Sequence, residues 1–130
     1  MIGYATFGSN DLDRARAFYD ALFPVIGAKR VMEFGENFTV YGVAMDRPAL
    51  GVCKPYDGAA ATAGNGAMIA LVVDSRDKVD ALHANAMELG GSDEGAPGVR
   101  GEDGDQAFYA AYFRDLDGNK FCAFRVGPAA

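Results

Sequence analysis

The stretch that decides the fold is Phe108–Arg125, which reads FYAAYFRDLDGNKFCAFR. It predicts two short strands joined by a turn. Phe108–Phe113 is aromatic and apolar, and Lys120–Val126 is again rich in residues that favour strands. Between them, Asp117-Gly118 is a strong turn signal, because glycine adopts positive φ without a Cβ clash and aspartate hydrogen-bonds its own backbone. Composition alone also fits an ordinary ribbon that closes a core, so the rest of the chain decides its role.

Size and charge limit the possible functions. The chain has 130 residues, the length of one domain or of two small modules around one core, and half of them are hydrophobic. A net charge of −6 and no cluster of Lys or Arg argue against nucleic acid or an anionic membrane as partner. No targeting segment and no uninterrupted apolar run of about eighteen residues is visible. Cys53 and Cys122 fit neither a disulfide framework nor a zinc spacing, so we expect a reduced, cytoplasmic setting.

The first half of the chain predicts one strand, one helix and three further strands. Residues 1–8 are apolar and aromatic, and Ser9-Asn10-Asp11 supplies oxygens that can cap the helix that follows. The helix carries one apolar stripe at helical spacing and ends at Pro24 and Gly27. Three short apolar runs then follow between residues 30 and 55, separated by turn signals.

The second half repeats this order after a linker at Tyr56–Gly66, YDGAAATAGNG, which is small and flexible in composition. Residues 67–73 predict a strand, Asp74-Ser75 caps a second amphipathic helix, and Gly90-Gly91 ends it. Ser92–Gly104 predicts a short strand and a mobile loop, after which the opening stretch begins.

The twofold repeat predicts an α+β fold in one domain over residues 1–130. Module one covers residues 1–55, the linker 56–66, and module two 67–130. Each module has a sheet with one face covered by a helix. Two such sheets place their helices outside and curve their other faces around a shared cleft.

Three segments carry a resemblance to a known family: GYATFGSNDLDRARAFYDALFPVIGAK, GNGAMIALVVDSRDKVDALHANAMELGG and YAAYFRDLDGNKFCAF. Their order and spacing resemble the vicinal oxygen chelate superfamily, which includes glyoxalase I, bleomycin-resistance proteins and extradiol ring-cleaving dioxygenases. The third segment is the most specific, since an aromatic strand, an Arg-Asp-x-Asp-Gly-Asn turn and a closing strand form that family's C-terminal signature. The resemblance implies two tandem βαβββ modules in a cupped, partly open eight-stranded mixed sheet with helices outside.

Members of this superfamily that use a divalent metal bind it inside the cup through His, Glu or Gln. The resemblance puts one ligand on the first and last strands of each module. The matching positions are Tyr4, Met68 and Cys122, with Cys53 as the best match for the fourth. None is a usual ligand for Mg²⁺, Mn²⁺, Ni²⁺ or Fe²⁺. We therefore expect no metal site and no cofactor, with a divalent metal as the alternative.

Two further kinds of metal site require other ligands. Both thiols, with Met68 as a soft third ligand, can hold Zn²⁺ or Cu⁺ only if the two sulfurs lie within roughly 4 Å of each other. Non-haem Fe²⁺ oxygenases typically use two His and a carboxylate, and this chain has a single His. That residue, His83, lies in the middle of the second helix, where we expect a structural or surface role.

A cup lined this way suits an apolar or aromatic small molecule. Tyr4 offers a hydroxyl and a ring face, and Met68 a deformable wall. Arg100 is a candidate clamp for an anionic group of a ligand. The other candidate lining residues are Cys53 and Cys122 and four aromatic residues. One or two of these aromatic residues, Tyr41, Phe38, Tyr109 and Phe113, must instead face the helices.

Three functions follow from these candidates. The first, which the ligand positions favour, is a metal-free protein that binds a small apolar or aromatic molecule, as bleomycin-resistance members do without chemistry. The second is a metal-dependent lyase, isomerase or dioxygenase of glyoxalase type. The third is a thiol-dependent enzyme or sensor, in which Cys122 acts as nucleophile if a positive neighbour lowers its pKa. By analogy with the family, we also expect a homodimer, since the paired-module cup often forms or completes across a twofold interface.

Overall fold

The computed structural model describes residues 1–129 and contains two βαβββ modules. Among these residues, no helix is long and apolar enough to cross a membrane. The elements of module one are β1 Tyr4–Gly8, α1 Leu12–Leu22, the 3₁₀ turn η1 Phe23–Ile26, β2 Lys29–Glu33, β3 Phe38–Gly42 and β4 Ala49–Cys53. Those of module two are β5 Ile69–Val72, α2 Arg76–Glu88, β6 Ser92–Arg100, β7 Phe108–Arg114 and β8 Lys120–Val126.

The two modules have the same sheet topology. The strand order is β1-β4-β3-β2 in one sheet and β5-β8-β7-β6 in the other. In each sheet the first and last strands of the module pair in parallel, and the remaining pairs are antiparallel. The α+β class and the twofold repeat are therefore confirmed, with the eight strands divided between two four-stranded sheets.

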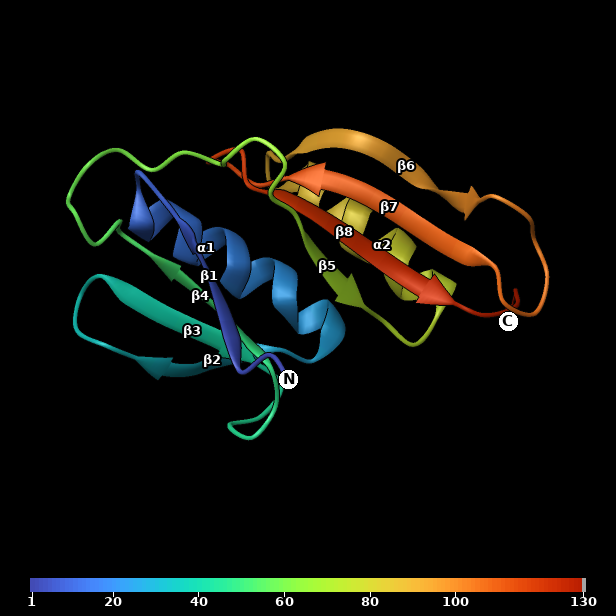
Figure 1. Cartoon of the computed structure of the whole chain (residues 1–130), viewed down its shortest axis with the longest axis horizontal. Coiled ribbons are helices and arrows are strands. Elements are labelled where there is room, and N and C mark those ends of the chain that lie inside the picture. The colour runs from blue at the N-terminus through green and yellow to red at the C-terminus, as the bar shows by residue number, and fades with distance from the viewer. Residues whose placement is uncertain (130) are drawn as a thin grey trace.

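Both helices lie on one side of the two sheets, behind them in Figure 1. They begin at the residues that the sequence indicated. The Asp11 side chain accepts a hydrogen bond from the Arg14 amide (3.1 Å), and the Ser75 hydroxyl accepts one from the Lys78 amide (3.2 Å). These bonds satisfy amides that have no partner within the first turn of a helix. The opposite faces of the sheets, toward the viewer, are called the open faces below.

A single hydrophobic core joins the modules. Phe7 on β1 packs edge-to-face on Phe121 of β8 with ring centroids 5.4 Å apart, and Tyr19 on α1 lies 6.0 Å from the same ring. Phe121 and Tyr19 are completely buried. The modules therefore share the apolar area that stabilises each of them, and we expect them to unfold together.

The turn between β7 and β8 is bonded to module one at several points. The Tyr19 hydroxyl donates a hydrogen bond to the buried Asp115 carboxylate. The Asn119 side-chain amide donates to the same carboxylate and to the Gly8 carbonyl, both at 2.9 Å. Asp117 accepts from the Asn10 amide (2.9 Å). The predicted hairpin is present, and its turn also holds the two modules together.

Two segments differ from the sequence-based expectation. The segment predicted to be a short strand and a mobile loop instead forms the nine-residue strand β6, which has register shifts on both sides of Gly95. The 56–66 linker contains no helix or strand, as its composition predicted. It is nevertheless held against module one, because the Asn10 side chain accepts from the Ala61 amide (2.7 Å) and donates to its carbonyl (3.1 Å).

The bond between Tyr19 and Asp115 gives a test of this junction. Tyr19→Phe keeps the buried ring but removes a donor from a buried carboxylate. We expect it to lower the free energy of unfolding by about 1.5–3 kcal/mol, the range for hydrogen bonds to charged groups. Urea denaturation of the wild type and the variant measures this difference.

Tyr41→Phe is the matched control. The Tyr41 ring is also buried, and its hydroxyl also bonds an aspartate, Asp20 (2.9 Å). That carboxylate is 44% exposed and also pairs with Arg30, so we expect a loss below about 1 kcal/mol. Equal losses in the two variants would show that the hydrogen bond between the modules contributes no more to the free energy of unfolding than a bond to an exposed carboxylate.

Candidate ligand-binding cleft

Strand alternation decides which side chains reach the open faces. On β1, Phe7 points into the core, and Tyr4 and Thr6 point the other way. On β8, Phe121 and Ala123 belong to the core. Lys120, Cys122 and Phe124 therefore share the open face of the second sheet.

Three aromatic rings gather on the open face of the first sheet. Tyr4 and Phe34 lie at either side of Phe38, with ring centroids 6.5 and 5.7 Å from it in edge-to-face arrangements. Tyr4 is 66% exposed and Phe34 59% exposed. Exposed aromatic rings packed on one another form an apolar surface that a ligand can cover. The three are called the aromatic trio.

A cleft leads from the aromatic trio toward the second sheet. Phe34 and Phe38 line an apolar groove of about 510 Å³ with Tyr4, and also a larger cleft of about 1280 Å³. Cys53, Met68 and Lys120 line the larger cleft as well, and the 56–66 segment forms one of its walls. The cleft is therefore bordered by both modules and the linker.

Strand register locates the four positions that the family resemblance assigns to metal ligands. Two residues after Tyr4, Thr6 pairs with Gly51, and two residues after Met68, Ala70 pairs with Cys122. Gly51 is therefore the counterpart of Cys122 in the first module. Cys53, which the sequence comparison favoured, lies on the same face two residues further along, opposite Gly8.

The residues at these positions do not fit a divalent metal. Tyr4 brings a phenol, Met68 a thioether and Cys122 a buried thiol, and Gly51 has no side chain. The Phe38 ring occupies the space over Gly51, because a Cβ built on this glycine would lie 2.8 Å from two ring carbons. Oxygen and imidazole ligands are what Mg²⁺, Mn²⁺, Ni²⁺ and Fe²⁺ prefer. Within residues 1–129, no group of three or more His, Cys, Asp or Glu is placed to hold a metal ion.

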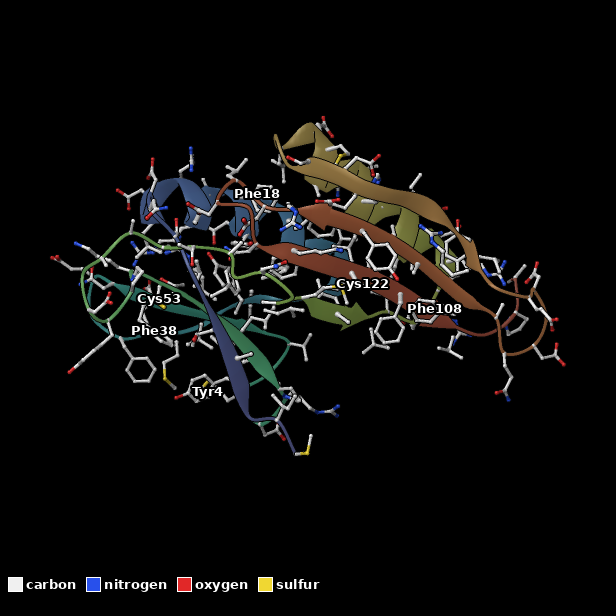
Figure 2. All side chains as sticks on the ribbon, turned by 45° about the horizontal axis from the view of Figure 1, so that its top comes forward. Tyr4, Phe18, Phe38, Cys53, Phe108 and Cys122 are labelled. Carbon is white, nitrogen blue, oxygen red and sulfur yellow. The ribbon has the colours of Figure 1, made fainter. Side chains whose placement is uncertain are left out.

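The two cysteines belong to different sheets, and Figure 2 shows them well apart. This separation does not provide the close pair of sulfurs that a shared Zn²⁺ or Cu⁺ needs. Burial raises the pKa of the Cys53 thiol. It also raises the pKa of the Cys122 thiol, although the hydrogen bond with Tyr112 and the charges of Arg100 and Lys120 act in the opposite direction. A raised pKa lowers the thiolate fraction that a nucleophile needs.

Three of the aromatic candidates face the helices. Tyr41 is buried, and its hydroxyl bonds Asp20 of α1. The Tyr109 hydroxyl bonds Asp80 of α2 (2.6 Å), and Phe113 is part of the core. β3 and β7 carry aromatic residues on both faces, so the sequence pattern could not show which of them face the helices and which face the cleft. These three residues leave the candidate set, and Phe38 remains in it.

Arg100 lies at the end of β6 and reaches the open face of the second sheet. Its guanidinium carbon is 5.5 Å from the centre of the Tyr112 ring, and the Lys120 ammonium nitrogen is 5.7 Å from the same ring. Tyr112 and Lys120 were not among the sequence candidates. The sequence could have predicted Tyr112, because the 115–119 turn sets the register that places it opposite Cys122. Lys120 follows from the same register, since it lies two residues before Cys122 on the same face of β8.

His83 has a structural position. It is 9% exposed on α2, and its Nε2 lies 2.9 Å from the Asp93 carboxylate on β6. The bond to His83 is the largest cause that lowers the pKa of Asp93. This pair joins the helix to the sheet edge on the side away from the cleft.

Comparisons with known proteins agree with the fold and the repeat. The model of the Glyoxalase/Bleomycin resistance protein/Dioxygenase superfamily matches residues 1–123. A glyoxalase/bleomycin resistance protein from Albidiferax ferrireducens T118 is 34% identical, with a TM-score of 0.84 over 96% of this chain and 98% of that one. No curated protein matches the sequence.

More distant structures share the fold alone. A glyoxalase/bleomycin resistance protein/dioxygenase family enzyme from Burkholderia phytofirmans PsJN is 20% identical, with a TM-score of 0.71 over 95% of this chain and 97% of that one. A lactoylglutathione lyase from Agrobacterium tumefaciens is 19% identical, with a TM-score of 0.64 over 96% and 92%. From the family match and the Albidiferax structure, the chain belongs to the glyoxalase/bleomycin resistance protein/dioxygenase superfamily.

Proposed function

We propose that this protein binds a small apolar or aromatic molecule in the cleft between its open faces, without a metal ion. The observation that carries the proposal is the aromatic trio, whose three rings line the groove and of which Phe34 and Phe38 also line the larger cleft. When a ring of a ligand covers such an aromatic surface, apolar area is removed from water and the free energy of the complex is lowered. Tyr4 adds a hydroxyl that can orient a polar group of the ligand.

The residue chemistry supports binding rather than metal-assisted catalysis. A Lewis acid needs ligands that hold it and an open coordination position for the substrate. The positions available offer a phenol, a thioether, a buried thiol and a glycine covered by Phe38. A lyase, isomerase or dioxygenase of glyoxalase type is therefore the less favoured alternative.

Phenylnaphthylamine, a neutral fluorescent aromatic probe, tests the cleft. We expect it to bind with increased fluorescence and Phe34→Ala to weaken binding about tenfold, because the variant removes one exposed ring of the trio. Fluorescence titration measures both dissociation constants.

Val43→Ala is the control for this titration, since Val43 is also an exposed apolar residue and lies outside the residues that line the groove and the cleft. We expect it to leave the affinity unchanged. If the wild type does not bind the probe, or if both variants bind it equally, the aromatic trio is not a ligand site.

Metal independence is tested by calorimetry. Protein dialysed against EDTA is titrated with Ni²⁺, Zn²⁺ and Mn²⁺ separately, and we expect no stoichiometric binding of any of them. The reason is the ligand set, which contains no carboxylate or imidazole at the four positions. Binding of one ion per chain would overturn the metal-free proposal and favour the glyoxalase-type alternative.

We also propose a homodimer in which a second copy covers part of the open faces. Large apolar side chains outside the aromatic trio are also exposed, including Ile2 next to β1 and Val72 and Val126 on the second sheet. Water contact with so much apolar surface is unfavourable, and a twofold partner would remove it. Light scattering at micromolar concentration is expected to give the mass of two chains. The mass of one chain would contradict this proposal.

The proposed setting is the cytoplasm, and the proposed partner is a small molecule rather than nucleic acid or a membrane. Both cysteines are free thiols, which suits a reducing compartment. The net charge of −6 opposes binding to a phosphate backbone or an anionic lipid surface.

A further inference from the structure

We propose that the ligand of the cleft carries an anionic group, a carboxylate or another small oxyanion, held between Arg100 and Lys120 over the Tyr112 ring. The inference rests on the proposed function, because it assigns the chemical class of the molecule bound there. It starts from two cations that approach one aromatic side chain, at 5.5 Å for the Arg100 guanidinium and 5.7 Å for the Lys120 ammonium.

The backbone of β6 is built around the Arg100 side chain. The guanidinium donates hydrogen bonds to the carbonyls of Gly98 (2.9 Å) and Ala96 (2.8 Å). A Cβ on Gly95 would lie 3.1 Å from one guanidinium nitrogen, and a Cβ on Gly98 would lie 3.3 Å from the other. The glycines leave room for the side chain to lie flat on the sheet. Two of the five N–H donors of the arginine are used in this way, and others remain for a ligand.

Lys120 connects this cation to the cleft. It lies on the open face of β8 and lines the same cleft as Phe34, Phe38 and Met68. Lys120 thus brings a positive charge to the lining of the cleft that Phe34 and Phe38 also border. Arg100 and Tyr112 lie next to this lining on the open face, where the Tyr112 ring, opposite Cys122 in the ladder, is approached by both cations.

The nearby carboxylates have other partners. Glu94 of β6 pairs with Arg114, and Asp93 pairs with His83. Lys120 contributes to the lowered pKa of Glu94, but the first cause is the hydrogen bond from Arg114. In the part of the chain that the structure describes, no ion pair is formed by Arg100 or Lys120. Both cations therefore lack a counter-ion beside the Tyr112 ring, and an anion bound at this ring would be attracted by both.

The test compares two probes that share one aromatic body. Phenylnaphthylamine is neutral, and anilinonaphthalene sulfonate adds one fixed negative charge. We expect the wild type to bind the sulfonate at least fivefold more tightly than the neutral probe, although the protein as a whole is acidic. Added sodium chloride is expected to weaken sulfonate binding and to leave binding of the neutral probe unchanged.

Variants locate the charge. Lys120→Gln and Arg100→Gln are each expected to weaken sulfonate binding about fivefold and to leave the neutral probe unaffected, and Lys120→Arg is expected to retain sulfonate affinity. Lys29→Gln is the matched control, because Lys29 is an exposed lysine outside the residues that line the groove and the cleft. It is expected to leave sulfonate binding unchanged. Lys54→Gln and Arg47→Gln, which remove single cations from the cleft and the groove, are expected to weaken sulfonate binding less than Lys120→Gln.

The outcomes separate this inference from the proposed function. If the neutral probe binds but the sulfonate gains nothing, or if its gain is lost in Lys54→Gln or Arg47→Gln instead, the anion clamp is overturned and the apolar cleft stands. If the sulfonate binds in a manner that depends on Lys120 and the neutral probe does not bind, the clamp is supported and the apolar cleft fails. Circular dichroism of each variant verifies that a loss of binding is not a loss of fold.

Discussion

The buried carboxylate of Asp115 is the constraint on which the rest of the structure depends. It accepts hydrogen bonds from the Tyr19 hydroxyl, from the Asn119 side chain and from the amides of Asp117 and Asn119. A carboxylate removed from water is tolerated only when its oxygens have such donors. The turn must therefore have this shape and α1 must have this position at the same time. Losing either would leave a buried carboxylate with fewer hydrogen-bond donors. Burial and this neighbouring carboxylate also raise the pKa of Tyr19, so that the phenol remains a donor.

This junction fixes the relative placement of the two open faces. Asn119 donates to the Gly8 carbonyl at the end of β1, and the Asn10 amide donates to Asp117. The same Asn10 holds the 56–66 segment through its side chain. The end of β1, the turn of module two and the linker are thus joined at one place. That place lies beside the cleft, whose lining includes Gly8, Ala61 and Asn119. The hydrogen bonds of the junction therefore constrain the shape of the cleft, and a preformed site costs a ligand less ordering free energy.

Local chemistry explains which features the sequence could predict. Helix caps, turn glycines and strand alternation depend on neighbouring residues, and these predicted both modules, the repeat and the turn. Contacts between distant residues could not be predicted in the same way. Tyr19 and Asp115 are 96 positions apart, and nothing in either segment indicates that they meet. Tyr41 and Tyr109 lie on strands with large apolar residues on both faces, so alternation left their direction open. Cys53 and Gly51 lie on the same face of β4. Only the pairing of β1 with β4 shows that Gly51, and not Cys53, is the counterpart of Cys122.

The residue at position 122 bears both on metal binding and on the charge of the cleft. A carboxylate here, as the family pattern implies, would stand opposite Tyr112 and close to Arg100 and Lys120, and would neutralise part of their charge. The thiol does not, because burial raises its pKa and keeps it protonated at neutral pH. The two cations therefore keep their field on the open face of the second sheet. In a metal-binding member, the positive charge that attracts a substrate oxygen belongs to the ion. Under the metal-free proposal, positive charge at the cleft would come instead from the Arg100 and Lys120 side chains, which can attract an anionic group but offer no coordination position for chemistry.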